Sequence, residues 1–340
     1  MLEPAFFHPY RQAVNRELQD FLSGRPLPLY DMMTYHLGWR DESGAPGEAV
    51  GKKLRPIFCL LACRAVGGDP DTSLPAASAL EMLHNFSLVH DDIEDETGLR
   101  RHRPAVWKLW GPAQGINVGD AMMALAHMAL YELEARGTDP ARVLQAARIL
   151  DETCLELCEG QYLDISFDSR QDVGVDDYVI MVSKKTGALF EASFKMGALL
   201  GSDTDSLMGP LGEFGRKMGL VFQIRDDFLG IWGEETVTGK PWAADIRRKK
   251  KTLPIIYALH QAKGAAGRDL EELYGQESLG DRDVSRVMGI LDDLGARDYV
   301  QDMAAKRHEE ALSALETTGL APSAQEELRE VGAYLMEREY

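Results

Sequence analysis

Long stretches of helix-forming residues constrain the fold of this 340-residue chain more than any other feature. Residues 118–136 (VGDAMMALAHMALYELEAR) are rich in Ala, Met and Leu and contain neither Pro nor, after their start, Gly. Residues 75–95 repeat apolar side chains at helical spacing, and residues 139–167 and 322–339 continue the same kind of pattern. Residues 176–184 (DDYVIMVSK) have the β-branched content of a strand, but their Asp-Asp start and helical neighbours favour a helix.

Signals for β-hairpins are nearly absent, and Gly and Pro lie mostly between the helical blocks. No repeat of fixed period and no low-complexity linker interrupts the pattern. We therefore predict an all-α protein in which residues 1–340 form a single domain, although the length alone would also allow two. Loops are expected near residues 41–49, 66–74, 98–115, 201–210 and 233–246.

The bulk composition excludes some classes of function. The net charge is −18, from 37 bases against 55 acids, whereas a general nucleic-acid binder needs a basic face. The first residues, MLEPAFFHPYRQ, lack the basic and apolar regions of a signal peptide, and no apolar run reaches transmembrane length. We expect a cytoplasmic protein without stable membrane insertion. The four cysteines form two pairs with helical spacing and no zinc pattern, so we expect buried, small apolar side chains: Cys59, Cys63, Cys154 and Cys158.

Two clusters of aspartates follow apolar helical runs. Asp91 and Asp95 are one helical turn apart, about 6 Å along the axis, so their carboxylates point the same way and repel each other. Hard oxygen ligands on one face suit Mg²⁺, which takes substrate phosphates as its remaining ligands. A solvated acidic helix end would explain one such cluster. A second pair, Asp226 and Asp227, favours instead a helical bundle with metal sites that face each other.

Basic segments accompany both acidic clusters. They are GKKLRP (51–56), Arg100 and Arg101, KKT (184–186), Lys240 and RRKKK (247–251). Acids for Mg²⁺ together with separate bases for phosphate oxygens are the composition of a diphosphate site. The RRKKK run could also be a nuclear-type signal or a nucleic-acid patch, but its place after the second acidic pair favours phosphate neutralisation.

Five ordered segments resemble the trans-isoprenyl diphosphate synthases, the polyprenyl synthetase family. They are GKKLRP, LVHDDIEDETGLRRHRP, KKTGALF, VFQIRDDFLG and GKPWAADIRRKKKTLP, and together they span nearly the whole chain. The resemblance implies an antiparallel helical bundle around a deep central cavity. It also implies a reaction that joins an allylic diphosphate to isopentenyl diphosphate, head to tail, with release of pyrophosphate.

The resemblance assigns roles to individual residues. Three Mg²⁺ ions would bind the first-motif aspartates and Asp226, with Asp92 and Asp227 binding or orienting in support. The allylic diphosphate (dimethylallyl, geranyl or farnesyl) would contact Arg100, Lys185 and Lys240, with Thr186, Gln223 and Lys250 close by. Isopentenyl diphosphate would lie in a metal-free pocket, and the protein would supply no base. The full set is Asp91, Asp92, Asp95 and Asp226 for metal, and Lys52, Arg55, His84 and Arg101 for isopentenyl diphosphate.

One departure concerns the second motif, which normally reads DDxxD but here has Gly230 at its fifth position. We expect activity to survive this change. The rival functions are a class I terpene cyclase, whose NDxxSxxxE-type motif is not found, and a non-catalytic subunit of a two-component synthase. The family also implies a homodimer.

Product length is predicted from residues 86 and 87. The residue five before Asp91 is the bulky Phe86, and the residue four before it is the small Ser87. In the family, an aromatic residue at the fifth position alone resembles one twenty-carbon type, so we expect geranylgeranyl diphosphate, with farnesyl diphosphate as the runner-up. Met122, Met123 and His127 could add to the floor of the cavity, and Phe86 could instead be core packing.

Overall fold

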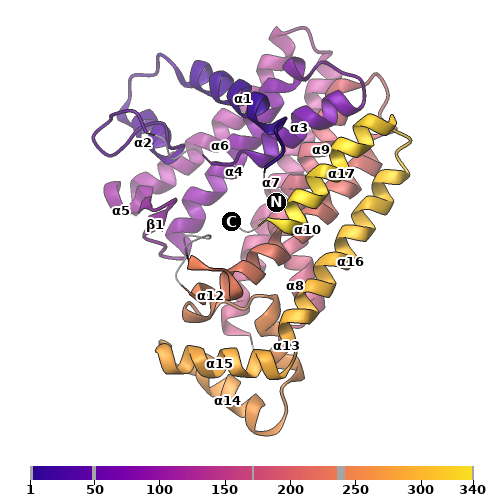
Figure 1. The fold of residues 1–340 in the computed structure, drawn as a ribbon. Coiled ribbons are helices and arrows are strands. Elements are labelled where there is room, and N and C mark those ends of the chain that lie inside the picture. The colour runs from indigo at the N-terminus through magenta and orange to yellow at the C-terminus, as the bar shows by residue number, and fades with distance from the viewer. Residues whose placement is uncertain (1–2, 48–50, 171, 236–241, 339–340) are drawn as a thin grey trace. The chain divides into compact units, whose positions relative to one another are not determined.

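The structure is a computed structural model and describes residues 3–47, 51–170, 172–235 and 242–338 (Figure 1). The described residues are mainly helical, with one short β-hairpin, which confirms the all-α prediction. The chain divides into two compact units, which are described separately. The N-terminal unit comprises residues 5–154 and 192–212, and the C-terminal unit comprises residues 1–4, 155–191 and 213–340. The single domain over residues 1–340 stays a prediction.

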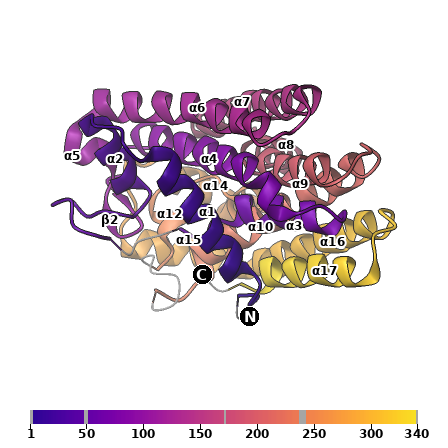
Figure 2. The same cartoon turned by 90° about the horizontal axis from the view of Figure 1, so that it is seen from above.

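The N-terminal unit is arranged around α4. Buried residues occur along the whole of α4, from Pro75 to Asp92, and α4 packs against α1, α3 and α6 (Figure 2). The elements of this unit are α1 (Phe7–Leu22), α2 (Pro28–His36), α3 (Leu54–Ala65), the 3₁₀ turn η1 (Pro70–Ser73), α4 (Leu74–Glu94), β1 (Leu99–Arg100), β2 (Arg103–Pro104), α5 (Val106–Trp110), α6 (Pro112–Ala135), and parts of α7 (Pro140–Ser169) and α9 (Ala188–Gly201).

The C-terminal unit contains the remaining parts of α7 and α9 and two apolar clusters. One cluster gathers around Tyr178, Ile224 and Leu253, and the other around Ile246, Leu270 and Val287. This unit also contains α10 (Met208–Trp232), except for its first turn, which belongs to the N-terminal unit. Its complete elements are α8 (Val175–Val182), the π-helix η2 (Ser183–Gly187), α12 (Ala244–Arg247), α13 (Leu253–Gln261), α14 (Gly264–Gly275), α15 (Asp281–Asp293), α16 (Ala296–Glu316) and α17 (Pro322–Glu337).

The predicted helices agree with the structure, including the helix over 176–184, which is α8 followed by η2. The loop predicted over 98–115 was wrong in part, because it contains the hairpin β1–β2, the helix α5 and the first turn of α6. Helix α6 begins at Pro112, where the fixed φ of proline favours a first helical turn and its missing N–H costs nothing. None of the described helices is long and apolar enough to cross a membrane.

The cysteine prediction holds for one pair and not for the other. Cys59 and Cys63 are fully buried on α3. Helix α9 approaches them so closely that a Cβ added at Gly197 would lie 2.1 Å from the carbonyl oxygen of Cys59. Cys158 is exposed and Cys154 only partly buried, because Cys158 lies among other exposed residues of α7, such as Leu155 and Tyr162.

Candidate active site

The first acidic cluster lies in the last turn of α4. Asp91 and Asp92 belong to this turn, Asp95 is the residue that ends the helix, and no basic residue is present there. The carbonyl end of a helix carries partial negative charge, so these carboxylates are unfavourable without a cation. The sequence therefore places charge where folding alone disfavours it, as expected of a binding site.

Arg100 binds one of these aspartates, Asp92, more closely than the others. Asp92 is almost fully buried, and Arg100 donates to its Oδ1 from Nη2 at 2.6 Å and from Nε at 3.0 Å. Burial raises the pKa of Asp92 above its usual value, against the opposing effect of Arg100. Asp91 is 23% exposed with its Oδ2 3.5 Å from Arg100 Nη2, and Asp95 is exposed. Asp91 and Asp95 thus offer oxygen atoms to solvent, whereas Asp92 holds Arg100.

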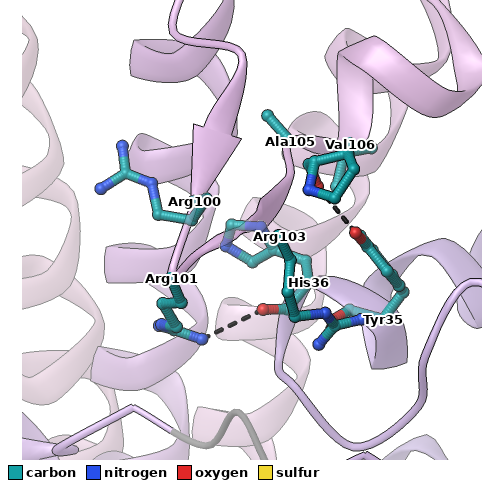
Figure 3. Close-up of a pocket in the computed structure, with 8 residues that line it drawn as sticks. Tyr35, His36, Arg100, Arg101, Arg103, Ala105 and Val106 are labelled. Atoms are coloured by element: carbon teal, nitrogen blue, oxygen red, sulfur yellow. Dashed lines mark hydrogen bonds between the residues drawn. The ribbon is translucent and has the colours of Figure 1, made fainter. Parts of the chain in front are cut away.

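A strained hairpin turn carries the arginines. β1 and β2 are joined by Arg101 and His102, whose φ angles are +52° and +60°. Turns of this kind usually contain Asn-Gly, because a positive φ costs an ordinary residue roughly 1–2 kcal/mol. The turn sends Arg101 toward His36, whose carbonyl oxygen accepts a hydrogen bond of 3.1 Å from Arg101 Nη1 (Figure 3). Strain of this kind is common at functional sites.

Arg103 has a different role from its two neighbours. Its guanidinium lies 4.0 Å from the centre of the Tyr35 ring and donates to the Arg40 carbonyl oxygen at 2.6 Å. The Tyr35 hydroxyl in turn donates to the carbonyl oxygen of Pro104 at 2.7 Å (Figure 3). Arg103 therefore fastens the hairpin to α2, which leaves Arg100 and Arg101 as the arginines of the site.

A cationic cluster lies beside the acidic cluster within the N-terminal unit. Arg55 Nη1 on α3 lies 3.2 Å from His84 Nε2 on α4. Burial, followed by the charges of Arg55 and Arg101, lowers the pKa of His84 well below its usual value, so the ring is neutral. Arg101 can come near the backbone before α3 because Gly51 has no side chain: a Cβ there would lie 2.9 Å from Arg101 Nη2. The predicted residues Arg55, His84 and Arg101 thus lie together in a positive environment suited to an anion.

His36 lies close to the same cationic cluster, and nothing in the sequence pattern indicates it. The side chain is buried, and its Nε2 has no hydrogen-bond partner among the described residues. Burial and the charges of Arg101 and Arg100 lower its pKa well below the usual value. A single histidine in a helical segment, distant from any of the motifs, carries no signal that distinguishes it from core packing.

The two lysines of GKKLRP serve different purposes. Lys53 has a φ of +52° at the start of α3, and its Nζ forms a buried ion pair of 3.1 Å with Glu81 Oε1 on α4. Lys52 is only half-buried, and its carbonyl oxygen accepts a hydrogen bond of 3.2 Å from Arg11 Nε. Lys53 therefore fixes the start of α3, and the role of Lys52 toward substrate stays a prediction.

In the C-terminal unit, Asp227 is buried, and its carboxylate connects three neighbouring segments. Its carboxylate accepts hydrogen bonds from the Tyr178 hydroxyl at 2.6 Å, Gln223 Nε2 at 2.9 Å and the Leu253 backbone N–H at 3.1 Å. Burial raises the pKa of Asp227 to about 6. Asp226 is 39% exposed, with its Oδ1 3.5 Å from Arg338 Nη2. The second pair therefore repeats the arrangement of the first, with one buried aspartate and one open to solvent.

The KKT segment forms the π-helix η2, a rare element that is frequent at functional sites. α7 passes close to it, since a Cβ at Gly160 would lie 2.3 Å from the backbone nitrogen of Lys185. Lys185 Nζ pairs with Asp164 Oδ2 at 2.6 Å, and the Thr186 hydroxyl donates to Gln223 Oε1 at 3.1 Å. Lys185, Thr186, Gln223, Asp227 and Lys250 line one pocket, and their role toward a substrate stays a prediction.

Two acids near this pocket, Asp164 and Asp245, were not predicted from the sequence. Burial lowers the pKa of Lys250, but Asp164, Asp227 and Asp245 outweigh it, and the net pKa lies above the usual value. Asp164 could have been noticed, because Asp168 follows it by one helical turn, as Asp95 follows Asp91. Asp245 is a lone acid within a basic segment and gave no such signal.

Asp245 occupies the space that the missing side chain at position 230 would need. A Cβ added at Gly230 would lie 2.0 Å from Asp245 Oδ2 and 2.6 Å from its Cγ. The second motif therefore lacks its last aspartate in sequence but has a carboxylate beside that position. This arrangement gives a physical reason to expect activity in spite of Gly230.

Gly230→Asp is therefore expected to lower activity and stability, although it restores the usual motif. The new side chain must displace the Asp245 carboxylate, which costs about 1–3 kcal/mol of overpacking in addition to like-charge repulsion. Thermal unfolding and turnover measure the two effects. The double variant Gly230→Asp/Asp245→Ala should recover part of the loss. Higher turnover of Gly230→Asp at an unchanged unfolding temperature would show that the space is not filled.

The remaining predicted residues are Lys240 and those proposed to limit the product length. Lys240 lies outside the described residues. Phe86 is half-buried on α4, and the Ser87 hydroxyl donates to the His84 carbonyl oxygen at 2.8 Å. Met122 is fully buried on α6. His127 is not a candidate for a cavity floor, because it reaches the surface, where its Nε2 lies 2.6 Å from Asp151 Oδ1.

Each unit offers carboxylates of a kind that suits Mg²⁺. In the N-terminal unit Asp91 and Asp95 present oxygen atoms one turn apart, and in the C-terminal unit Asp226 presents another. Among the described residues no group of three or more His, Cys, Asp or Glu forms a ready metal cage. Mg²⁺ does not need such a cage, because it keeps several waters and binds through one or two carboxylates and substrate phosphates.

Comparison with known proteins agrees with this chemistry. The polyprenyl synthetase family model matches residues 46–291. A (2E,6E)-farnesyl diphosphate synthase of Mycobacterium tuberculosis is 37% identical over 329 residues, covering 95% of this chain and 89% of that protein. A geranylgeranyl diphosphate synthase of the same organism is 39% identical over 291 residues, covering 85% and 81%.

Solved structures agree in fold. A polyprenyl synthetase from Streptomyces coelicolor A3(2) superposes with a TM-score of 0.89 at 33% identity, covering 96% of this chain and 98% of that one. A geranylgeranyl pyrophosphate synthetase from Pyrococcus horikoshii gives 0.87 at 32% identity, covering 98% of each chain. Because the family model matches most of the chain and these relatives align along nearly all of it, the chain belongs to the polyprenyl synthetase family, and it is a trans-prenyltransferase with the all-α isoprenoid synthase fold.

Proposed function

We propose that the protein joins isopentenyl diphosphate to an allylic diphosphate with the help of Mg²⁺, and that its main product is geranylgeranyl diphosphate. The observation that carries this proposal is the adjoining pair of sites in the N-terminal unit. Asp91 and Asp95 suit a metal-bound diphosphate, and the cationic cluster of Arg55, His84 and Arg101 suits a second diphosphate without metal. A terpene cyclase has one diphosphate to bind and no need for the second pocket.

Catalysis in this proposal depends on the charge of the departing diphosphate. The allylic carbon–oxygen bond breaks, the double bond of isopentenyl diphosphate attacks the allylic carbon, and a proton leaves the new chain. Bound Mg²⁺ ions, about three per site, would neutralise the leaving group. Arg100 is fixed by Asp92 and adds a rigid positive charge beside Asp91. Lys185, Lys240 and Lys250 serve the same substrate.

No protein base is assigned. His84 is neutral, but its Nε2 lies 3.2 Å from the Arg55 guanidinium, which can only donate, so this nitrogen is already an acceptor. The released pyrophosphate takes the proton in our proposal. His84 then acts as a neutral group that orients Arg55 toward isopentenyl diphosphate.

The two diphosphate pockets make a kinetic prediction. Arg55→Ala and His84→Ala are expected to raise the KM for isopentenyl diphosphate more than the KM for the allylic substrate. The loss of a charge-assisted hydrogen bond costs about 1.5–3 kcal/mol, which corresponds to roughly 10- to 100-fold in affinity. Arg100→Ala should show the opposite preference. Initial rates with each substrate varied in turn measure both constants, and the reverse pattern would mean that the two sites are exchanged.

The product length rests on Phe86. The growing chain must run away from the charged groups along apolar side chains, and Phe86 lies about 7 Å deeper along α4 than Asp91. With Ser87 beside it, one aromatic ring remains to limit the chain, which favours twenty carbons over the fifteen of farnesyl diphosphate.

Phe86→Ala is expected to lengthen the product by one or more isoprene units, because the removed ring leaves a space that further units can fill. Chromatography of the products after phosphatase treatment measures the chain length. Ser87→Ala is the matched control, because it removes only a hydroxyl one position away. An unchanged distribution in Phe86→Ala would show that the chain is limited elsewhere.

We also propose a cytoplasmic homodimer. Helix α6 leaves the large apolar side chains of Ile116, Met128 and Tyr131 exposed. A second copy of the chain would cover such a surface.

A further inference from the structure

We infer that His90, held against Gly119 of α6, positions the Phe86 ring and thereby helps to set the length of the product. This inference rests on the proposed role of Phe86 in limiting the chain. It assigns to His90 a positioning role, although the residue directly precedes the first aspartate motif. All the residues concerned lie in the N-terminal unit.

α4 and α6 touch at two glycines one turn apart. A Cβ at Gly115 would lie 2.7 Å from Ile93 Cδ1, and a Cβ at Gly119 would lie 2.2 Å from His90 Nε2 and 2.3 Å from its Cδ2. Real Cβ contacts are essentially never this short, so the imidazole fills the space that the missing side chain of Gly119 leaves. The close approach of the two helices at this level depends on a glycine.

Hydrogen bonding fixes the ring in this space. His90 Nε2 lies 3.2 Å from the carbonyl oxygen of Ile116, which can only accept, so Nε2 carries the proton and donates. Asp120 Oδ1 lies farther from the same nitrogen, at 3.7 Å. The ring is thus located by packing against Gly119 and by one hydrogen bond to the backbone of α6.

His90 in turn contacts Phe86. The two rings are one helical turn apart on α4, with their centres 4.9 Å apart and their planes at 66°, an edge-to-face arrangement. The pairs Ile93–Gly115 and His90–Gly119 show that the two helices run antiparallel, so Phe86 is expected beside the next turn of α6, near Met122. A located imidazole therefore restricts the rotamers that the Phe86 ring can adopt.

Two substitutions should disturb this arrangement from opposite sides. His90→Ala removes the ring that supports Phe86. Gly119→Ala places a methyl group where the imidazole now lies, and the end of the His90 side chain can move more easily than the backbone. In both variants the Phe86 ring loses its support, and the wall that limits the product becomes less well defined.

The test is the product distribution of the full-length protein, measured at equal, low conversion with Mg²⁺, isopentenyl diphosphate and farnesyl diphosphate. We expect His90→Ala and Gly119→Ala to raise the ratio of longer products to the main product severalfold. The double variant His90→Ala/Phe86→Ala should match Phe86→Ala alone, since His90 acts through Phe86. Asp120→Asn should leave the ratio unchanged, because it removes the more distant carboxylate and keeps the packing.

The outcomes separate this inference from the proposed function. If Phe86→Ala lengthens the product but His90→Ala does not, the positioning role is wrong and the role of Phe86 stands. If Phe86→Ala changes nothing, the limit itself lies elsewhere and the inference fails with it. A further lengthening by His90→Ala in the Phe86→Ala background would show that His90 acts independently. His90→Ala decides the question if Gly119→Ala does not fold.

Discussion

Asp91→Ala and Asp226→Ala are each expected to lower turnover by a factor on the order of 10³ while the helical content and the unfolding temperature remain nearly unchanged. Both carboxylates are partly exposed, at 23% and 39%, and each lies 3.5 Å from an arginine. Arg338, the buried partner of Asp226, also donates to the Phe222 carbonyl oxygen at 3.0 Å, so it keeps a hydrogen bond in Asp226→Ala. In the proposed reaction the barrier depends on charge at the departing diphosphate, and these aspartates would offer oxygen atoms to Mg²⁺. Steady-state rates and circular dichroism measure the two effects.

The matched control for Asp91 is Glu94→Gln. Glu94 is exposed in the same turn of α4 and carries the same charge, but the motif gives it no role. Turnover of this variant should stay within a few-fold of the wild type. Near wild-type turnover of Asp91→Ala, or an equal loss in Glu94→Gln, would contradict the assignment, because the second result would indicate a general effect of charge.

Removing Glu81 is expected to have the largest effect on stability. The side chains of Lys53 and Glu81 are only 1% and 3% exposed, and Asn85 Nδ2 also donates to Glu81 Oε1 at 2.9 Å. Glu81→Ala leaves the Lys53 ammonium buried without its partner, which costs about 3–5 kcal/mol. Denaturant unfolding followed by circular dichroism measures the change in the free energy of unfolding.

The double variant Lys53→Met/Glu81→Leu separates the ion pair from simple packing. Apolar residues of similar volume fill the same space without an uncompensated charge, and such replacements are often neutral. The double variant should therefore be more stable than Glu81→Ala. A cost below about 1 kcal/mol for Glu81→Ala would mean that water reaches Lys53 and that the pair does not fix the start of α3.

The helices could be predicted because their signals are local. Apolar residues at helical spacing and strong helix formers, as in residues 118–136, give the same result whatever surrounds them. The hairpin β1–β2 could not be predicted, because its turn residues are Arg101 and His102 rather than Asn-Gly. Tertiary contacts, such as the one between Arg101 and the His36 carbonyl oxygen, override the local preference there.

The candidate site could be predicted only where its charged residues lie close together in the sequence. Asp91 and Asp95 are one helical turn apart, and Arg100 and Arg101 are adjacent in sequence. Like charges placed so closely repel each other, which indicates that something of opposite charge binds there. His36 and Asp245 come from single positions, and their importance arises only when the fold brings them beside arginines or beside Gly230. The different roles of Asp91 and Asp92 also require the structure, since burial and the position of Arg100 decide them.

The most direct test of the proposed function uses the unmodified protein with Mg²⁺, isopentenyl diphosphate and either dimethylallyl or farnesyl diphosphate. Pyrophosphate release is followed over time, and the products are identified by chromatography after phosphatase treatment. We predict pyrophosphate release that requires both substrates and Mg²⁺, with geranylgeraniol as the main alcohol. Pyrophosphate release from the allylic substrate alone with formation of a cyclic hydrocarbon, or no release with both substrates present, would contradict the account.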